Sequence, residues 1–169
     1  MELKKELLKE HSIRQVHKVV DYVGDNPRRF KVLIQLFLAG SYRVTQRAGW
    51  PLTYILEAHP HLVTPYFPKV LKMMERQDVH DAVKRNVVRF LQYMDIPARY
   101  QGKVAQCCFA FLMDPKVAIA IRVFSMTVLA NIARQQPDLK KEHRIIIEDQ
   151  MPYGTAAFRS RGRKILKEC

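Results

Sequence analysis

The chain has 169 residues, of which 48% are hydrophobic and 27% are charged, and this composition excludes a disordered or low-complexity class. Its 29 Lys and Arg residues against 16 Asp and Glu give a net charge of +13, which favours an anionic partner: nucleic acid, an acidic protein or anionic lipid. No apolar run approaches the roughly 20 residues that a membrane span needs, and residues 1–10 lack the apolar core of a secretion signal, so we expect a soluble protein.

Helical periodicity runs along the whole chain, and no strand pattern interrupts it. Breaks at Pro, Gly or Asp divide the pattern into pairs of helices. The charged residues 1–10 and the Arg-rich last helix are expected to act as polar caps at the two ends. The predicted first helices cover residues 12–23, 43–58, 81–94, 117–134 and 155–167, and the predicted second helices cover 28–38, 62–76, 99–113 and 139–149.

Aspartates stand near several predicted helix starts, where free backbone N–H groups need an acceptor. Asp78 or Asp81, Asp114 and Asp138 are therefore the predicted N-caps. The segment Asp78-Val-His-Asp81 is also the densest acid–base cluster of the chain. Capping explains its aspartates more simply than proton chemistry does.

The predicted first helices repeat one another. Residues 47–60 align with residues 124–137 at a constant shift of 77, and a middle copy and a last half-copy complete the series at intervals of 37 to 39 residues. An earlier, shorter unit precedes these copies. The leucine column of the series reads Leu52, Leu91, Leu129 and Leu166, with Val19 in the shorter unit.

A period of about 38 residues with Pro and Leu after the first helix resembles HEAT-type repeats. The resemblance implies an all-α fold, an α-α superhelix or solenoid of about four and a half HEAT-like helix hairpins, in a single domain over residues 1–169. One hairpin cannot cover its own apolar face, so neighbouring hairpins stack into one continuous core. Such a fold is typical of a non-catalytic binding or scaffold module.

Cations occupy the same helical positions in successive copies. Because residues 44, 48, 52 and 55 form the buried stripe, position 50 should face water, and its column reads Trp50, Arg89, Thr127 and Lys164. A flanking column reads Thr45, Lys84, Arg122 and Arg159. With the cations next to them, these columns could contact phosphates or carboxylates of a partner. The candidate binding residues are Trp50, Lys84, Arg85, Arg89, Arg122, Arg159, Arg161, Arg163 and Lys164.

Each candidate also has a structural interpretation. Pro51 could turn Trp50 inward against Tyr54 or the next helix, and flanking cations in solenoids often bridge neighbouring repeats. The second helices, which usually line the inner face of a solenoid, carry further Lys and Arg residues that do not align in columns. A groove lined by them is the expected binding surface for an acidic protein or nucleic acid.

Enzymatic chemistry has little support in the sequence. Gly-rich phosphate loops, H-E-x-x-H and G-x-S-x-G are missing, so no small-molecule cofactor or metal is implied and any activity is uncertain. His59 and His61 suit an exposed turn. Cys107 and Cys108 suit a helix core, and with Cys169 they make an odd count that is typical of a reducing cytoplasm.

Two alternatives stay open beside the binding module. HEAT-like DNA glycosylases, which excise alkylated bases, resemble this chain in repeat type and charge, although no residue-by-residue motif aligns. A structural homo-oligomer is the other alternative, formed through an uncapped apolar end near Ile165 and Leu166.

Overall fold

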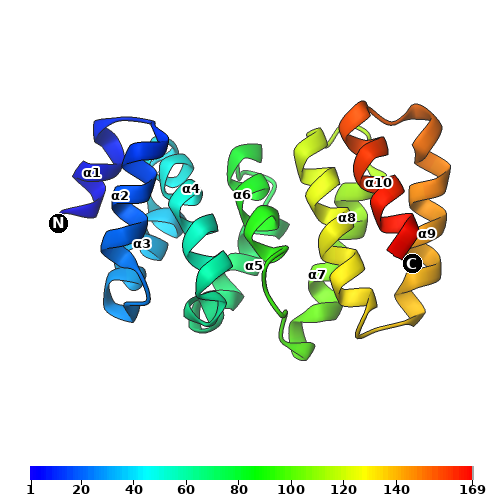
Figure 1. Cartoon of the computed structure of the whole chain (residues 1–169), viewed down its shortest axis with the longest axis horizontal. Helices are drawn as coiled ribbons and strands as arrows, with labels where there is room; N and C mark the ends of the chain where they lie inside the picture. Colours follow the sequence, from blue (N-terminus) through cyan, green and yellow to red (C-terminus); the bar gives the residue numbers. More distant parts are fainter. Residues whose placement is uncertain (169) are drawn as a thin grey trace. The chain divides into compact units, whose positions relative to one another are not determined.

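The computed structural model describes residues 1–168, which form ten α-helices and two short 3-10 helices and contain no strand (Figure 1). The all-α prediction is confirmed, and the predicted helix ranges are confirmed to within a few residues except at the N-terminus and over residues 62–66, which belong to a 3-10 helix. The elements are α1 (Leu3–Lys9), α2 (Ile13–Val23), α3 (Pro27–Ala39), α4 (Tyr42–Ala58), η1 (Pro60–Tyr66), α5 (Phe67–Glu75), α6 (Asp81–Leu91), α7 (Ala98–Met113), α8 (Ile119–Ala133), α9 (Asp138–Gln150), η2 (Met151–Tyr153) and α10 (Ala156–Glu168).

The helices form two compact units, one from Met1 to Met94 and one from Asp95 onward. In the first unit α4 is central, because it packs against α1, α2, α3 and α6 (Figure 1). In the second unit α8 has this place and packs against α7, α9 and α10. The single domain over residues 1–169 stays a prediction.

The helix pairs are offset by one helix from the predicted pairs. α3 packs far more extensively on α4 than on α2, and α7 packs extensively on α8, so a hairpin opens with a predicted second helix and closes with the next first helix. Residues 3–9, expected to be only a polar cap, are the helix α1, which packs on α2 and α4. Leu3 and Leu7 of α1 are buried, so α1 packs on α2 where the sequence predicted residues 28–38 as its partner.

The buried columns of the first helices are confirmed. The leucine column is buried at each full copy and half-buried at Leu166 in the last helix. The small-residue column, which lies four residues earlier, is also buried in every copy. These core positions are Val44, Val83, Ile121 and Phe158 in the first column, Ala48, Val87, Ser125 and Gly162 in the second, and Leu52, Leu91 and Leu129 in the third.

The aspartate caps were predicted wrongly. The N-cap of α6 is His80, whose Nδ1 accepts a hydrogen bond from the Ala82 N–H at 3.1 Å, and Asp78 pairs with Arg76 instead. Asp114 ends α7 and accepts from the Lys116 N–H at 2.8 Å, because a turn separates it from the start of α8. Asp81 and Asp138 are the first residues of α6 and α9, where a negative charge favours the helix dipole without capping it.

Small residues let the first helices of one unit approach each other closely. Gly49 of α4 faces the buried Asn86 of α6, and a Cβ atom built on Gly49 would lie 2.7 Å from Asn86 Cγ and 2.9 Å from its Cβ. Real Cβ atoms do not tolerate such contacts, so α4 and α6 would have to separate. Gly102 of α7 has no heavy atom within 4 Å of the same virtual Cβ.

We predict opposite effects for alanine at these two glycines. Gly49→Ala should lower the free energy of unfolding by about 1–3 kcal/mol, because overpacking between α4 and α6 exceeds the gain in helix propensity. Gly102→Ala should raise it by up to about 1 kcal/mol, since only the propensity term acts. Urea unfolding of the two variants and the parent measures both changes. An equal gain in stability at both positions would contradict the packing of α4 on α6.

Candidate binding surfaces

The exposed face of α4 carries aromatic side chains next to cations. Tyr42, Trp50 and Tyr54 lie on one diagonal row of the helix, because they are eight and four residues apart. Tyr42 is 50% exposed, and the other two are half-buried. We call this surface, with the exposed Arg43 and the half-buried Arg47, the α4 face. Trp50 therefore neither faces water fully, as its column predicts, nor enters the core, as the alternative predicts.

Each aromatic side chain of the α4 face contacts a histidine from another element. His11, between α1 and α2, lies with its ring centroid 5.1 Å from Trp50, and His17 of α2 lies 5.7 Å from Tyr54. His80, the cap of α6, lies 4.6 Å from Tyr42. The contact of Trp50 is thus with the connection from α1 to α2.

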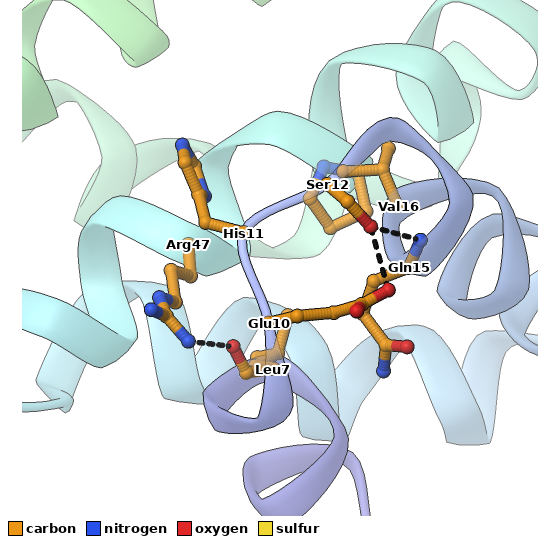
Figure 2. Close-up of a pocket in the computed structure, with 8 residues that line it drawn as sticks. Leu7, Glu10, His11, Ser12, Gln15, Val16 and Arg47 are labelled. Atoms are coloured by element: carbon orange, nitrogen blue, oxygen red, sulfur yellow. Dashed lines mark hydrogen bonds between the residues drawn. The ribbon is translucent and has the colours of Figure 1, made fainter.

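A small cavity lies where α1, α2 and α4 meet, and His11, Gln15 and Arg47 are among the residues that line it (Figure 2). Its volume of about 10 Å³ leaves room for about one water molecule, so it is not a ligand pocket. Arg47 reaches from α4 across this joint and donates a hydrogen bond to the Leu7 carbonyl at 3.0 Å, as Figure 2 shows. The bond fixes α4 to the end of α1.

The cations at the N-terminus are largely compensated. The Glu6 carboxylate accepts hydrogen bonds from Lys18, Lys9 and Gln15, which lower the pKa of Glu6 to about 2. Arg14 pairs with Glu10 at 3.2 Å. This charge pattern therefore fastens α1 to α2.

The predicted cations of α6 lie beside the α4 face. Arg85 is exposed, and Lys84 and Arg89 are half-buried. Since α4 and α6 pack side by side, Arg89 takes the same place on α6 as Trp50 on α4. Three of the predicted site residues, Lys84, Arg85 and Arg89, thus lie on α6, next to the aromatic row of α4.

A groove runs between α8 and α10 in the second unit. One part has a volume of about 160 Å³, and a neighbouring part of about 300 Å³ extends to Pro137 and Lys140. Arg161 donates to Thr127 Oγ1 across the groove, and Arg134 pairs with Glu168 at 3.3 Å. We call this feature the α8–α10 groove. It is lined by Thr127, Ala130, Asn131, Arg134, Arg161, Lys164, Ile165 and Glu168.

The sequence does not predict that Arg134, Asn131 and Lys140 lie at this groove. These residues stand outside the columns of Trp50 and Thr45, in which the predicted cations recur. Arg134 and Asn131 occupy the same side of α8 as Thr127, at helical spacings of three to seven residues, which is the signal that could have identified them.

Two cations of the flanking column bind within their own unit. Arg122 donates through Nε to the Leu112 carbonyl at 3.2 Å and through Nη2 to Gln150 Oε1, and its guanidinium lies 5.0 Å from the ring centroid of Phe158. Burial lowers the pKa of Arg122. Arg159 donates to the Gly154 carbonyl at 2.8 Å. The bridging interpretation is confirmed for Arg122, whereas Arg159 only secures the start of its own helix.

Exposed cations remain on the last helix. Arg163 and Lys164 of α10 are exposed, and Arg159, Arg163 and Lys167 follow one another at four-residue intervals. Ile165 of the same helix is only 3% exposed, and Leu166 is half-buried. The expected uncapped apolar end was therefore wrong at Ile165, which packs into the unit.

The other candidate clusters have simple structural roles. Asp25 pairs with His61 at 2.9 Å and lies 3.8 Å from His59 Nδ1. Within residues 1–168, no group of three or more His, Cys, Asp and Glu side chains is arranged to hold a metal. Cys107 is half-buried and in no disulfide, and burial raises the pKa of the Cys108 thiol to about 12. Cys169 lies outside the described residues.

His143 is the least satisfied polar group in the described part of the second unit. Its side chain on α9 is fully buried beside the Phe109 ring, at 6.3 Å between centroids, and neither ring nitrogen has a hydrogen-bond partner. Burial lowers the pKa of His143 to about 4. The imidazole of His143 is therefore uncharged and packs in the core as an apolar side chain would.

Paired helices, a period near 38 residues and continuous buried columns define an all-α helical repeat protein. A family model described as HEAT repeat domain matches residues 3–169, and the chain belongs to this family. HEAT repeats are typically protein-binding scaffolds. No curated protein and no solved structure matches the chain. Among the described helices, none has the length and apolar character to cross a membrane.

We predict that the two arginines Arg122 and Arg163 differ in their effect on stability. Arg122→Ala should lower the free energy of unfolding by about 1–3 kcal/mol, because two hydrogen bonds and the contact with Phe158 are lost. Arg163→Ala is the matched control on an exposed site and should change it by less than about 0.5 kcal/mol. Chemical unfolding of both variants measures the difference, and equal losses would refute the bridging role of Arg122.

We predict an acid-sensitive contribution from His143. The unfolded chain binds a proton near pH 6.5 and the folded chain only near pH 4, so stability falls as the pH drops through this window. Between pH 7.5 and pH 5 the loss is about 2 kcal/mol. His143→Leu should remove this part of the loss, as urea unfolding at the two pH values would show. The same loss in His143→Leu and in the parent would exclude His143 as its source.

Proposed function

We propose that this HEAT repeat protein is a non-catalytic binding module whose basic surfaces hold an acidic protein or a nucleic acid. The charge of α10 is the observation that supports the proposal best. Five cations and one carboxylate, Glu168, occur in its 13 residues. A helix that serves only as a polar cap needs a soluble surface, and a mixture of acidic and basic side chains supplies one. α9, for example, carries four acidic and three basic side chains. Charge of one sign on an exposed helix instead attracts an anionic ligand.

The predicted site residues differ in their availability for such a ligand. Arg122 is committed to the packing of the second unit, and Arg161 donates across the α8–α10 groove. Arg85, Arg163 and Lys164 are exposed. We therefore assign ligand contact to these three side chains first and a positioning role to the other two.

Cys107 and Cys108 are in no disulfide, which fits a reducing compartment, and we propose the cytoplasm. At the physiological ionic strength of this compartment, the electrostatic attraction of the basic helices extends over about 8 Å. Contact between the cations and the anionic groups of the partner is therefore needed for appreciable affinity.

A charge-reversal experiment tests the proposal. Fluorescence anisotropy would measure binding of labelled single-stranded DNA, duplex DNA and a glutamate-rich peptide at about 50 mM and about 200 mM salt. We expect at least one to bind, with an affinity that falls steeply with salt. Arg163→Glu with Lys164→Glu should weaken binding at least roughly tenfold, since two contacts become repulsive.

The matched control for this experiment carries the same change of charge elsewhere in the second unit. Lys116→Glu with Lys141→Glu alters two exposed cations outside α10 and should have a smaller effect, because salt screens charges that do not touch the partner. Equal weakening by both pairs would assign binding to net charge alone. If none of the three polyanions binds at the lower salt concentration, the proposal is wrong.

A further inference from the structure

The aromatic row of the α4 face is more than the packing of the first unit requires. Tyr42, Trp50 and Tyr54 contact His80, His11 and His17, with ring planes inclined by 50°, 60° and 83° respectively. None of these pairs is parallel, and none of the three rings is buried, since Tyr42 is exposed and Trp50 and Tyr54 are half-buried. Tyr42 in particular is half exposed although its partner is close.

Cations accompany the aromatic row. Arg43 and Arg47 lie on the same side of α4, one turn apart, and Arg85 and Arg89 follow on the adjacent α6. In the 17 residues of α4 the one carboxylate is Glu57, near the C-terminal end. Aromatic side chains beside cations are the combination that binds single-stranded nucleic acid, in which every base offers a π-face and every linkage a phosphate.

The spacing of the row favours a single strand over a duplex. Along the helix axis, Trp50 and Tyr54 are separated by about 6 Å and Tyr42 and Trp50 by about 12 Å, whereas stacked bases on one strand of a duplex are about 3.4 Å apart. Bases that follow the row must therefore be parted from one another, as in an extended single strand. In a duplex the π-faces are covered by neighbouring bases, and an acidic peptide has no need of three aromatic contacts.

We infer that the α4 face binds single-stranded nucleic acid, with bases stacked on Tyr42, Trp50 and Tyr54 and phosphates held by Arg43, Arg85 and Arg89. The inference rests on the proposed function and deepens it by naming the class of partner. Arg47 is excluded from the phosphate contacts, because it is bonded to the Leu7 carbonyl.

The single Trp of the chain makes this site directly observable. Titration of the full chain with an oligothymidylate of about 15 nucleotides should give a saturable loss of Trp50 emission, because stacked bases quench the indole. An abasic oligomer with the same number of phosphates is the matched probe. It should bind more weakly, by roughly fivefold or more, and leave the emission unchanged.

Variants of the row test the stacking contacts separately from the fold. Tyr42→Ala should weaken oligothymidylate binding roughly fivefold or more, and Tyr42→Phe, which keeps the ring, should bind as the parent does. Tyr153→Ala is the control, since Tyr153 is 90% exposed in η2, outside the α4 face, and should have no effect. Circular dichroism would confirm that each variant is folded.

The outcomes separate the inference from the proposed function. If oligothymidylate and the abasic oligomer bind equally and Trp50 emission does not change, stacking is refuted and the proposed function stands. If duplex quenches Trp50 as strongly as the single strand, or only the acidic peptide binds, the inference is wrong and the proposed function again stands. If no polyanion binds, both are wrong.

Discussion

Close packing between the helices of one unit is the constraint on which the other features depend. Gly49 lets α4 approach Asn86 of α6. Gly162 lets α10 approach Ile147 of α9 and Met151 of η2, where a Cβ atom would lie 3.1 Å from Ile147 Cγ2 and 2.8 Å from Met151 Sδ. A helix that is packed on both flanks and on its inner side has one exposed face. Only the side chains of that face can contact a partner. The α4 face is that surface in the first unit, and α10 presents it in the second.

The same packing decides which cations are available to a partner. Arg122 and Arg159 occupy one column of the repeat, yet Arg122 meets the side chain of Gln150 and the ring of Phe158, whereas Arg159 on the last helix reaches only the carbonyl of Gly154. An arginine between two helices is thus part of the packing. Arg159 has no such side-chain contact among the described residues and is exposed, so its charge extends into solvent.

The repeat period of the sequence predicts the positions that recur in successive copies. It does not predict contacts that occur in one copy alone. The buried columns recur, so Leu52, Leu91 and Leu129 identify the helices and the family from the sequence alone. The partners of the exposed residues occur once: His11 lies in the connection between α1 and α2, and His80 caps α6. Neither has a counterpart in the other copies that an alignment of repeats could reveal. The pairing of α3 with α4 also escapes prediction, because both pairings give the same apolar stripes.

Fixed buried positions leave the exposed positions free to differ between copies, and here they differ systematically. The column that holds His17, Trp50 and Arg89 in the first unit continues with Thr127 and Lys164 in the second, so its aromatic rings occur only in the first two positions. Stacking contributes free energy only at short range and to flat partners, whereas charge acts over a Debye length and on any anion. Both kinds of contact meet on the α4 face, where Tyr42, Trp50 and Tyr54 lie beside Arg43 and Arg89, as the inferred single-stranded partner requires.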